Sequence, residues 1–247
     1  MSNSVYAVET TDLTRRFGKF VAVDKVSLNI HKGEIFGFLG ANGAGKTTLI
    51  RMLSGILAPS SGQASVAGYN IYNQTEQIKK NIGYMSQKFS LYDDLTIAEN
   101  IDFFGGIYGL STQILEERKA SLLQKVGLAD FSNRMTRDLP LGFKQRLALG
   151  SSLLHDPPII FLDEPTSGVD PKARRIFWDL IYDTCEMGKT IFVTTHFMDE
   201  AEYCHRVSIL RDGRIIALDN PRALKEKYGK SSMQEVFVHI VKEKDLE

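Results

Sequence analysis

Apolar residues in this chain fall into short continuous runs and into helical spacings, and turn residues separate the two kinds of segment. A continuous apolar run between turn signals is typical of a strand that is buried on both faces of a parallel sheet. Alternation of apolar and polar residues indicates a strand with one buried face. The continuous runs lie at 34–39, 159–162 and 190–195, and the alternating ones at 5–8 and 26–30. These segments are predicted to be strands.

Helix signals occupy much of the remaining chain. Thr96 and Thr112 stand where a side chain can cap a helix N-terminus, and Gly109 and Gly127 follow where a helix would stop. The apolar segment that begins at Leu49 can open another helix. The remaining predicted helices span 96–108, 112–126, 145–154, 171–187 and 221–228.

This order of elements predicts an α/β fold with a mostly parallel sheet. The strand-rich first 70 residues are expected to form an antiparallel β portion, and the mostly helical stretch 90–155 to form an inserted subdomain. Asp212-Gly213 is a strong turn dipeptide and predicts a hairpin. We expect residues 1–247 to form a single domain with a C-terminal extension over about 220–247, in which 234–241 fits a helix or a strand.

Residues 40–48 match the phosphate-loop pattern Gly-x4-Gly-Lys-[Ser/Thr], and they lie between a predicted strand and a helix start. Such a turn is an anion site, because its backbone N–H groups and the helix dipole both attract phosphate. Lys46 is expected to reach the β- and γ-phosphates, and the Thr47 hydroxyl to ligate Mg²⁺. The expected nucleotide contacts in the loop are Gly40, Asn42, Gly43, Ala44, Gly45, Lys46, Thr47 and Thr48.

Two acids follow the apolar run at 159–162. Asp163 is expected to hold Mg²⁺, often through water. Glu164 is expected to orient and deprotonate an attacking water. His196 ends the next predicted strand, so in a parallel sheet it would emerge at the same carboxyl edge as the acids. We therefore expect the three side chains to meet near the γ-phosphate.

Composition narrows the possible partners. Thirty Lys and Arg balance thirty Asp and Glu, which argues against nucleic acid as the main partner. The first residues lack a secretory pattern, and no run of about 18 apolar residues occurs. Cys185 and Cys204 have no metal or redox spacing, as expected of idle thiols in a reducing compartment. We expect a cytoplasmic protein whose membrane role would come through a partner.

Together these motifs resemble the ATP-binding subunits of ABC transporters, from about residue 6 to about residue 241. The Walker A motif of that family matches 40–47, and its Walker B motif with the catalytic glutamate matches 159–164. The resemblance implies a P-loop NTPase core with ATP and Mg²⁺ as cofactors. It also assigns the Q-loop glutamine, near Mg²⁺ and the attacking water, to Gln87, the D-loop aspartate to Asp170, the adenine-stacking aromatic to Phe17 and the switch histidine to His196.

The resemblance implies a motor subunit that hydrolyses ATP. Two copies, or one copy and a paralogue, would face each other head to tail, and Gly142 of one would contact the ATP held by the other. ATP binding would close this pair and hydrolysis would reopen it. An integral membrane permease subunit would dock on the stretch 89–110 and hold the protein at the inner face of the cell membrane. Segments 91–96, 195–202 and 234–238 look most like the drug-export branch.

One element departs from the family's pattern. The signature Leu-Ser-Gly-Gly-Gln aligns here with residues 139–143, so Pro140 replaces the serine and Leu141 replaces the first glycine. Pro140 offers neither a hydroxyl nor an N–H group to a phosphate. A lost hydrogen bond to a charged group costs about 1.5–3 kcal/mol, or about 10- to 150-fold. The favoured hypothesis is an active ATPase that uses backbone amides at 142–144. The other is a degenerate site that binds ATP but hydrolyses it poorly.

Two other function classes explain less of the sequence. A soluble, non-transport ABC ATPase is the main alternative, but its relatives normally carry a second such domain or a long coiled-coil insertion. A GTPase or kinase with a phosphate loop would leave Glu164 and His196 unexplained, and the sequence contains no Asn-Lys-x-Asp motif. The cargo is not readable from the chain, because specificity belongs to the membrane subunit.

Overall fold

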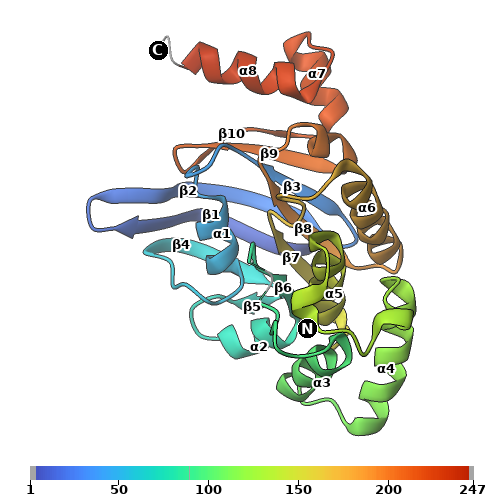
Figure 1. The fold of residues 1–247 in the computed structure, drawn as a ribbon. Coiled ribbons are helices and arrows are strands. Elements are labelled where there is room, and N and C mark those ends of the chain that lie inside the picture. The colour runs from blue at the N-terminus through green and yellow to red at the C-terminus, as the bar shows by residue number, and fades with distance from the viewer. Residues whose placement is uncertain (1–3, 89, 245–247) are drawn as a thin grey trace.

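Two sheets form the body of the molecule (Figure 1). A computed structural model describes residues 4–88 and 90–244. In the larger sheet the strand order is β10-β9-β3-β8-β7-β6, and all neighbours run parallel except the hairpin of β9 and β10. The strands are β3 (Ile35–Leu39), β6 (Ile82–Met85), β7 (Ile159–Asp163), β8 (Thr190–Thr195), β9 (Arg206–Arg211) and β10 (Arg214–Asp219). The predicted mostly parallel sheet is confirmed.

The smaller sheet is antiparallel, with the order β2-β1-β4-β5, and confirms the predicted N-terminal β portion. Its strands are β1 (Tyr6–Phe17), β2 (Phe20–His31), β4 (Ser61–Val66) and β5 (Tyr69–Asn70). The β1–β2 pairing shifts register between Thr10 and Leu13, among other places. Such bulges break the alternation of inward and outward side chains. For this reason the sequence pattern revealed only parts of these two long strands.

The helices flank the sheets and extend beyond them at both ends of the molecule (Figure 1). Those of the predicted helical subdomain, α3 to α5, lie at one end, and α7 and α8 lie at the other. The helices are α1 (Lys46–Leu53), α2 (Thr75–Lys80), α3 (Ile97–Ile107), α4 (Thr112–Lys125), α5 (Leu141–Leu153), α6 (Pro171–Glu186), α7 (Pro221–Tyr228) and α8 (Met233–Lys244). No helix among the described residues is both long and apolar enough to span a bilayer.

Local capping explains where several helices begin. Thr96 caps α3 as predicted, because its hydroxyl accepts from the Glu99 N–H while the Glu99 carboxylate accepts from the Thr96 N–H. The cap predicted at Thr112 is wrong by one residue, since the Ser111 hydroxyl accepts from Ile114 N–H and Thr112 is already helical. The helix predicted at 145–154 is α5, and it begins earlier, at Leu141. Pro140 takes its N-cap position and makes no side-chain capping bond, so no capping signal was visible in the sequence there.

Side chains of the larger sheet belong to two buried hydrophobic clusters, one on each face of the sheet. Phe38 and Phe192 belong to the cluster between the sheets and α1. Leu39 belongs to the opposite cluster, which contains Trp178 of α6 and Val236 of α8. With both faces covered, the open parts of the parallel strands are their ends. Ligands of open α/β sheets bind at the carboxyl ends, and the predicted catalytic residues lie there.

Candidate active site

The phosphate loop connects β3 to α1, and only glycine fits at several of its positions. Gly43 and Gly45 have φ angles of 83° and 104°, in the left-handed region. A Cβ at Gly45 would lie 2.3 Å from the carbonyl oxygen of Ala22, and one at Gly40 would lie 2.6 Å from that of Leu210. The loop is therefore pressed against neighbouring backbone and enters α1 at an N-terminus whose free N–H groups and dipole attract an anion.

Lys46 lies over this loop and is almost completely buried. Its ammonium donates to the carbonyl oxygens of Gly40 at 2.7 Å and Ala41 at 3.1 Å. It also lies 3.2 Å from Oε1 of Glu164. The positive charge is thus positioned between the loop and the acid, where a phosphate in the loop would meet it.

Asp163 ends β7 and accepts two hydroxyl hydrogen bonds on the same oxygen. Thr47 Oγ1 donates to Oδ1 at 3.1 Å and Thr194 Oγ1 donates to it at 2.7 Å. Among the described residues, no three His, Cys, Asp or Glu side chains form a metal-binding cluster. Mg²⁺ ordinarily takes one or two carboxylates together with phosphate and water oxygens, so a paired hydroxyl and carboxylate beside a phosphate loop fit it.

We expect Asp163→Asn to raise the melting temperature of the nucleotide-free protein. Burial raises the pKa of Asp163, although hydrogen bonds from Thr194 and Thr47 oppose the shift. Ionisation of Asp163 therefore lowers the free energy of unfolding. This loss of stability is absent below the ordinary pKa of 3.8 and complete once the pH exceeds the raised pKa of Asp163. The amide oxygen of asparagine keeps both hydroxyl bonds without the charge.

Thermal unfolding without Mg²⁺ or nucleotide checks this prediction. The variant should melt above the parent at pH 7, and the two curves should converge as the pH falls toward 4. A lower melting temperature of the variant at pH 7 would contradict it.

The other predicted catalytic residues, Gln87 and His196, both contact the carboxylate of Glu164. Its Oε2 accepts from Nε2 of Gln87 at 3.1 Å and lies 3.1 Å from Nδ1 of His196, while its Oε1 faces Lys46. The backbone of Glu164 has a φ of 48°, and its N–H donates to the hydroxyl and the carbonyl oxygen of Thr194. A non-glycine residue in this strained region is typical of a functional site. The shared carboxyl edge of β7 and β8 brings these groups together.

A cavity of about 380 Å³ lies over the loop. Its wall contains Phe20, whose ring is 63% exposed. Phe17 is opposite Phe20 in the β1–β2 register and does not line the cavity, and the guanidinium of Arg15 lies 4.5 Å from its ring centre. Sequence reasoning missed Phe20, although two aromatics around a tight turn were a visible signal. The lining residues are Phe20, Ala22, Asn42, Gly43, Gly45, Lys46, Thr47, Thr48, Gln87 and Glu164.

Of the other predicted site residues, none lines this cavity: Gly40, Ala44, Gly142, Asp163, Asp170 and His196. Ala44 is buried within the loop. Gly142 lies in the first turn of α5, and Asp170 caps α6 by accepting from the N–H groups of Lys172 and Ala173 at 3.0 Å. Gly142 and Asp170 line a second hollow together with Pro140. The structure thus separates these two residues from the loop of the same chain.

Gln145 connects the two regions and was missed as a functional candidate. It is fully buried in α5, and its Nε2 donates a hydrogen bond to the carbonyl oxygen of Pro165. Pro165 directly follows Glu164. The helix that begins beside Gly142 is therefore tied to the segment that carries the acid.

The fold and this site define an ABC-type ATP-binding domain. The ABC transporter family matches residues 23–167, which is more than half of the chain and includes the phosphate loop, Gln87 and both acids. The chain therefore belongs to the ABC transporter family, as an ATP-binding domain with the P-loop α/β fold.

Relatives and solved structures agree with this assignment. The probable multidrug ABC transporter ATP-binding protein YbhF of Escherichia coli strain K12 is 46% identical over 97% of this chain, but the match spans only 42% of YbhF. The Nod factor export ATP-binding protein I of Rhizobium sp. strain N33 is 37% identical over 95% of this chain and 77% of its own length. A dimeric post-hydrolysis structure of the ATP-binding cassette MJ0796 with ADP and Pi has a TM-score of 0.78 at 27% identity, covering 86% of this chain and 98% of the other.

Proposed function

We propose that this chain binds and hydrolyses Mg-ATP and thereby drives a separate export subunit in the membrane. The observation that carries the proposal is the carboxylate of Glu164, which faces Lys46, Gln87 and His196 directly beside the phosphate loop. Phosphoryl transfer to water needs an anion cradle, a positive charge on the γ-phosphate and a base near the water. This site offers all three within one cavity.

The order of events follows from the ion pair between Lys46 and Glu164. A γ-phosphate arriving at the loop competes for the Lys46 ammonium, which leaves Glu164 free to accept a proton from water. Gln87 and His196 then hold the carboxylate and the water in place. Thr47 and Asp163 would hold Mg²⁺, which supplies charge neutralisation on the phosphates when bound. The adenine-stacking role of Phe17 remains a prediction, and Phe20 is a second candidate for it.

A complete site requires a second ATP-binding subunit, either a copy of this chain or a paralogue. Gly142 lies outside the cavity formed by its own phosphate loop, which supports a head-to-tail partner that presents it to the nucleotide. MJ0796, a solved relative, forms a dimer with ADP and Pi bound. Asp170 borders the same hollow as Gly142 and would face the nucleotide of the opposite subunit.

We expect Pro140→Ser to strengthen ATP-dependent pairing of two chains about 10-fold or more, because the serine hydroxyl restores one hydrogen bond to a charged phosphate. Serine is also a better N-cap for α5 than proline and so stabilises the helix independently of ATP. Pairing of the two chains is therefore measured both with and without ATP, which isolates the ATP-dependent part. Sedimentation of both proteins in a Glu164→Gln background measures the effect without turnover. Equal ATP-dependent pairing would show that backbone amides already suffice.

The permease subunit is proposed to dock on α3 and the segment before it. Tyr92, Phe103 and Ile107 are 47%, 38% and 61% exposed there, and the rings of Tyr92 and Phe103 lie 4.4 Å apart. Phe89, which begins the predicted docking stretch, lies outside the described residues. This partner would hold the protein at the cytoplasmic face of the membrane. Export is favoured because the relatives are named for multidrug transport and Nod factor export.

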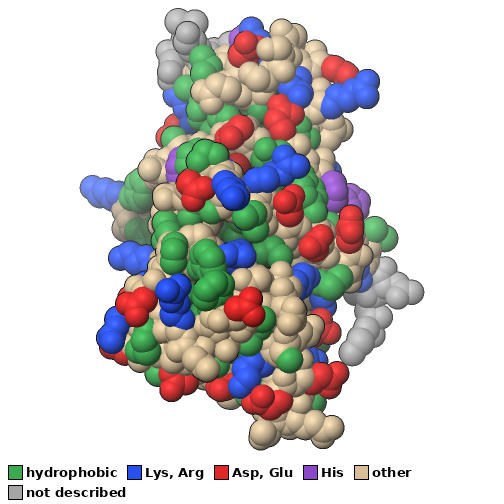
Figure 2. Space-filling model, turned by 45° about the vertical axis from the view of Figure 1, so that its right-hand side comes forward, with side chains coloured by type: hydrophobic (Ala, Val, Ile, Leu, Met, Phe, Trp, Pro, Cys, Tyr) green, Lys and Arg blue, Asp and Glu red, His purple; other side chains and the backbone are tan. Residues whose placement is uncertain are grey.

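Nucleic acid is not the proposed partner. The formal net charge is zero, and acidic and basic side chains are interspersed on the face shown in Figure 2. Purification of the full chain from membranes in detergent tests the assignment. Recovery with an integral membrane protein, and Mg²⁺-dependent phosphate release by that complex, would support the proposal. Recovery with ribosomal RNA, or no hydrolysis above background, would overturn it.

A further inference from the structure

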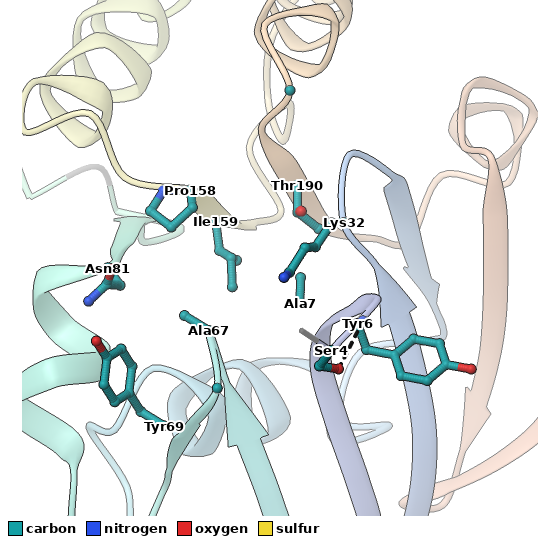
Figure 3. A pocket seen from close by; sticks show the side chains of 12 residues that line it. Ser4, Tyr6, Ala7, Lys32, Ala67, Tyr69, Asn81, Pro158, Ile159 and Thr190 are labelled. Carbon is teal, nitrogen blue, oxygen red and sulfur yellow. Dashed lines mark hydrogen bonds between the residues drawn. The ribbon is translucent and has the colours of Figure 1, made fainter. Parts of the chain in front are cut away.

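Another cavity, of about 320 Å³, opens at the opposite end of the parallel strands (Figure 3). Ile159 and Thr190, the first residues of β7 and β8, form one side, and Ala7 of β1 and Tyr69 of β5 contribute from the other sheet. Parallel strands rise about 3.3 Å per residue, so the cavity lies roughly 13–17 Å from the catalytic ends of β7 and β8. It shares no lining residue with the phosphate-loop cavity.

The floor of this cavity is apolar and continuous with the protein core. Ala7 and Ile159 are 3% and 2% exposed and belong to the cluster between the two sheets. Small residues keep the space open, among them Ala67, Gly68 and Gly188. A ligand that entered here would therefore cover apolar surface at the point where the two sheets diverge.

The rim is polar and includes one positive charge. In Figure 3 the amino group of Lys32 is turned toward the middle of the cavity. Within residues 4–88 and 90–244, Lys32 makes no ion pair or side-chain hydrogen bond, and the Tyr69 hydroxyl likewise has no hydrogen-bond partner. The amide nitrogen of Asn81 donates to the carbonyl oxygen of Gln77 at 2.8 Å. The exposed side chain of Lys32 thus places an ammonium, without a counter-ion among the described residues, beside an apolar floor.

We propose that this cavity binds a small amphipathic carboxylate. Its apolar body lies against Ala7 and Ile159, and its carboxylate accepts from the Lys32 ammonium. The volume is at the lower end of the range for small-molecule sites and suits about ten non-hydrogen atoms. Because hydrogen bonds between opposite charges are about twice as strong as neutral ones, a neutral molecule of the same shape binds less tightly.

Titration of the full chain with octanoate tests the proposal, with octanamide as the uncharged analogue and amide chemical shifts as the readout. Octanoate should shift the amides of Ala67, Gly68 and Gly188 in a saturable manner and bind about 2- to 5-fold more tightly than octanamide, since Lys32 is exposed and its ion pair is screened by water. Lys32→Met should abolish that difference and leave octanamide binding unchanged. The matched control, Lys25→Met, removes an exposed lysine of β2 and should change neither affinity.

Saturating Mg-ATP separates this site from the nucleotide site. Octanoate should bind equally well with the nucleotide present, since the two cavities share no residue. Competition with Mg-ATP, equal affinity for octanoate and octanamide, or full octanoate binding by Lys32→Met would each overturn the proposal. Tyr69→Phe gives an independent check on where the carboxylate lies, because the Tyr69 hydroxyl is on the side of the cavity away from the Lys32 ammonium in Figure 3. We expect it to change neither affinity.

Discussion

Replacing Glu164 by glutamine is expected to slow ATP hydrolysis about 100- to 10,000-fold while ATP binding is retained. The amide keeps the shape of the side chain beside Gln87 and His196 but cannot accept a proton from water. ATP would then stay intact in the site and hold two chains together. Phosphate release in a single turnover measures the loss, and mass in solution with and without Mg-ATP measures the expected shift from monomer to dimer.

Glu226→Gln serves as the matched control for this variant. Glu226 pairs with Arg222 at the exposed surface of α7, so the same chemical change there removes an ion pair without touching the site. Normal hydrolysis by Glu164→Gln would show that another group takes the proton. Retained ATP binding without a dimer would show that the residue 139–142 signature does not hold a γ-phosphate between two copies of this chain, and a paralogous partner would then be sought.

Replacing Lys46 by methionine is expected to weaken ATP binding about 100-fold, because a charge-assisted contact with the β- and γ-phosphates is lost. The same change should lower the free energy of unfolding of the nucleotide-free protein by about 1–3 kcal/mol. Lys46 faces the nearly buried carboxylate of Glu164, and without Lys46 the contacts left to that charge among the described residues are Gln87 and His196. Equilibrium ATP titration and denaturant unfolding measure the two effects.

The double variant Lys46→Met with Glu164→Gln separates these effects. Removing the acid together with the lysine leaves no uncompensated charge, so stability should recover most of the loss. ATP affinity should remain weak, because the phosphate contact is still absent. If stability fails to recover, the destabilisation arises from the lost bonds to Gly40 and Ala41 rather than from the ion pair.

The parallel sheet was predictable because its strands are continuous apolar runs that end in functional residues. The run at 190–195 predicted both a buried strand and the emergence of His196 beside the acids. Four strands and helices gave no such signal. The strand Ser61–Val66 has few apolar residues, β5 and β6 are only two and four residues long, and α2 has a single buried side chain, Ile78.

The candidate site was predictable in its residue types but not in its local geometry. Spacing alone identified Lys46 and the two acids. The left-handed backbone of Glu164 was not predictable, because it depends on bonds from its N–H to Thr194 of another strand. The structural role of Gln145 was equally hidden, since a glutamine in the middle of a helix resembles a surface residue until its burial is known.

The buried hydrogen bond from Gln145 to Pro165 has a mechanical consequence. Gln145 is fully buried and its Oε1 has no hydrogen-bond partner among the described residues, so breaking the Nε2 bond to Pro165 would leave the whole amide unpaired. This bond therefore resists separation of the start of α5 from the loop after Glu164. In a head-to-tail pair, force applied at Gly142 by the opposite subunit's nucleotide is therefore delivered to the backbone that carries this subunit's own base. ATP bound at one site would then affect the other site through displacement of the Glu164 backbone rather than through electrostatic interaction.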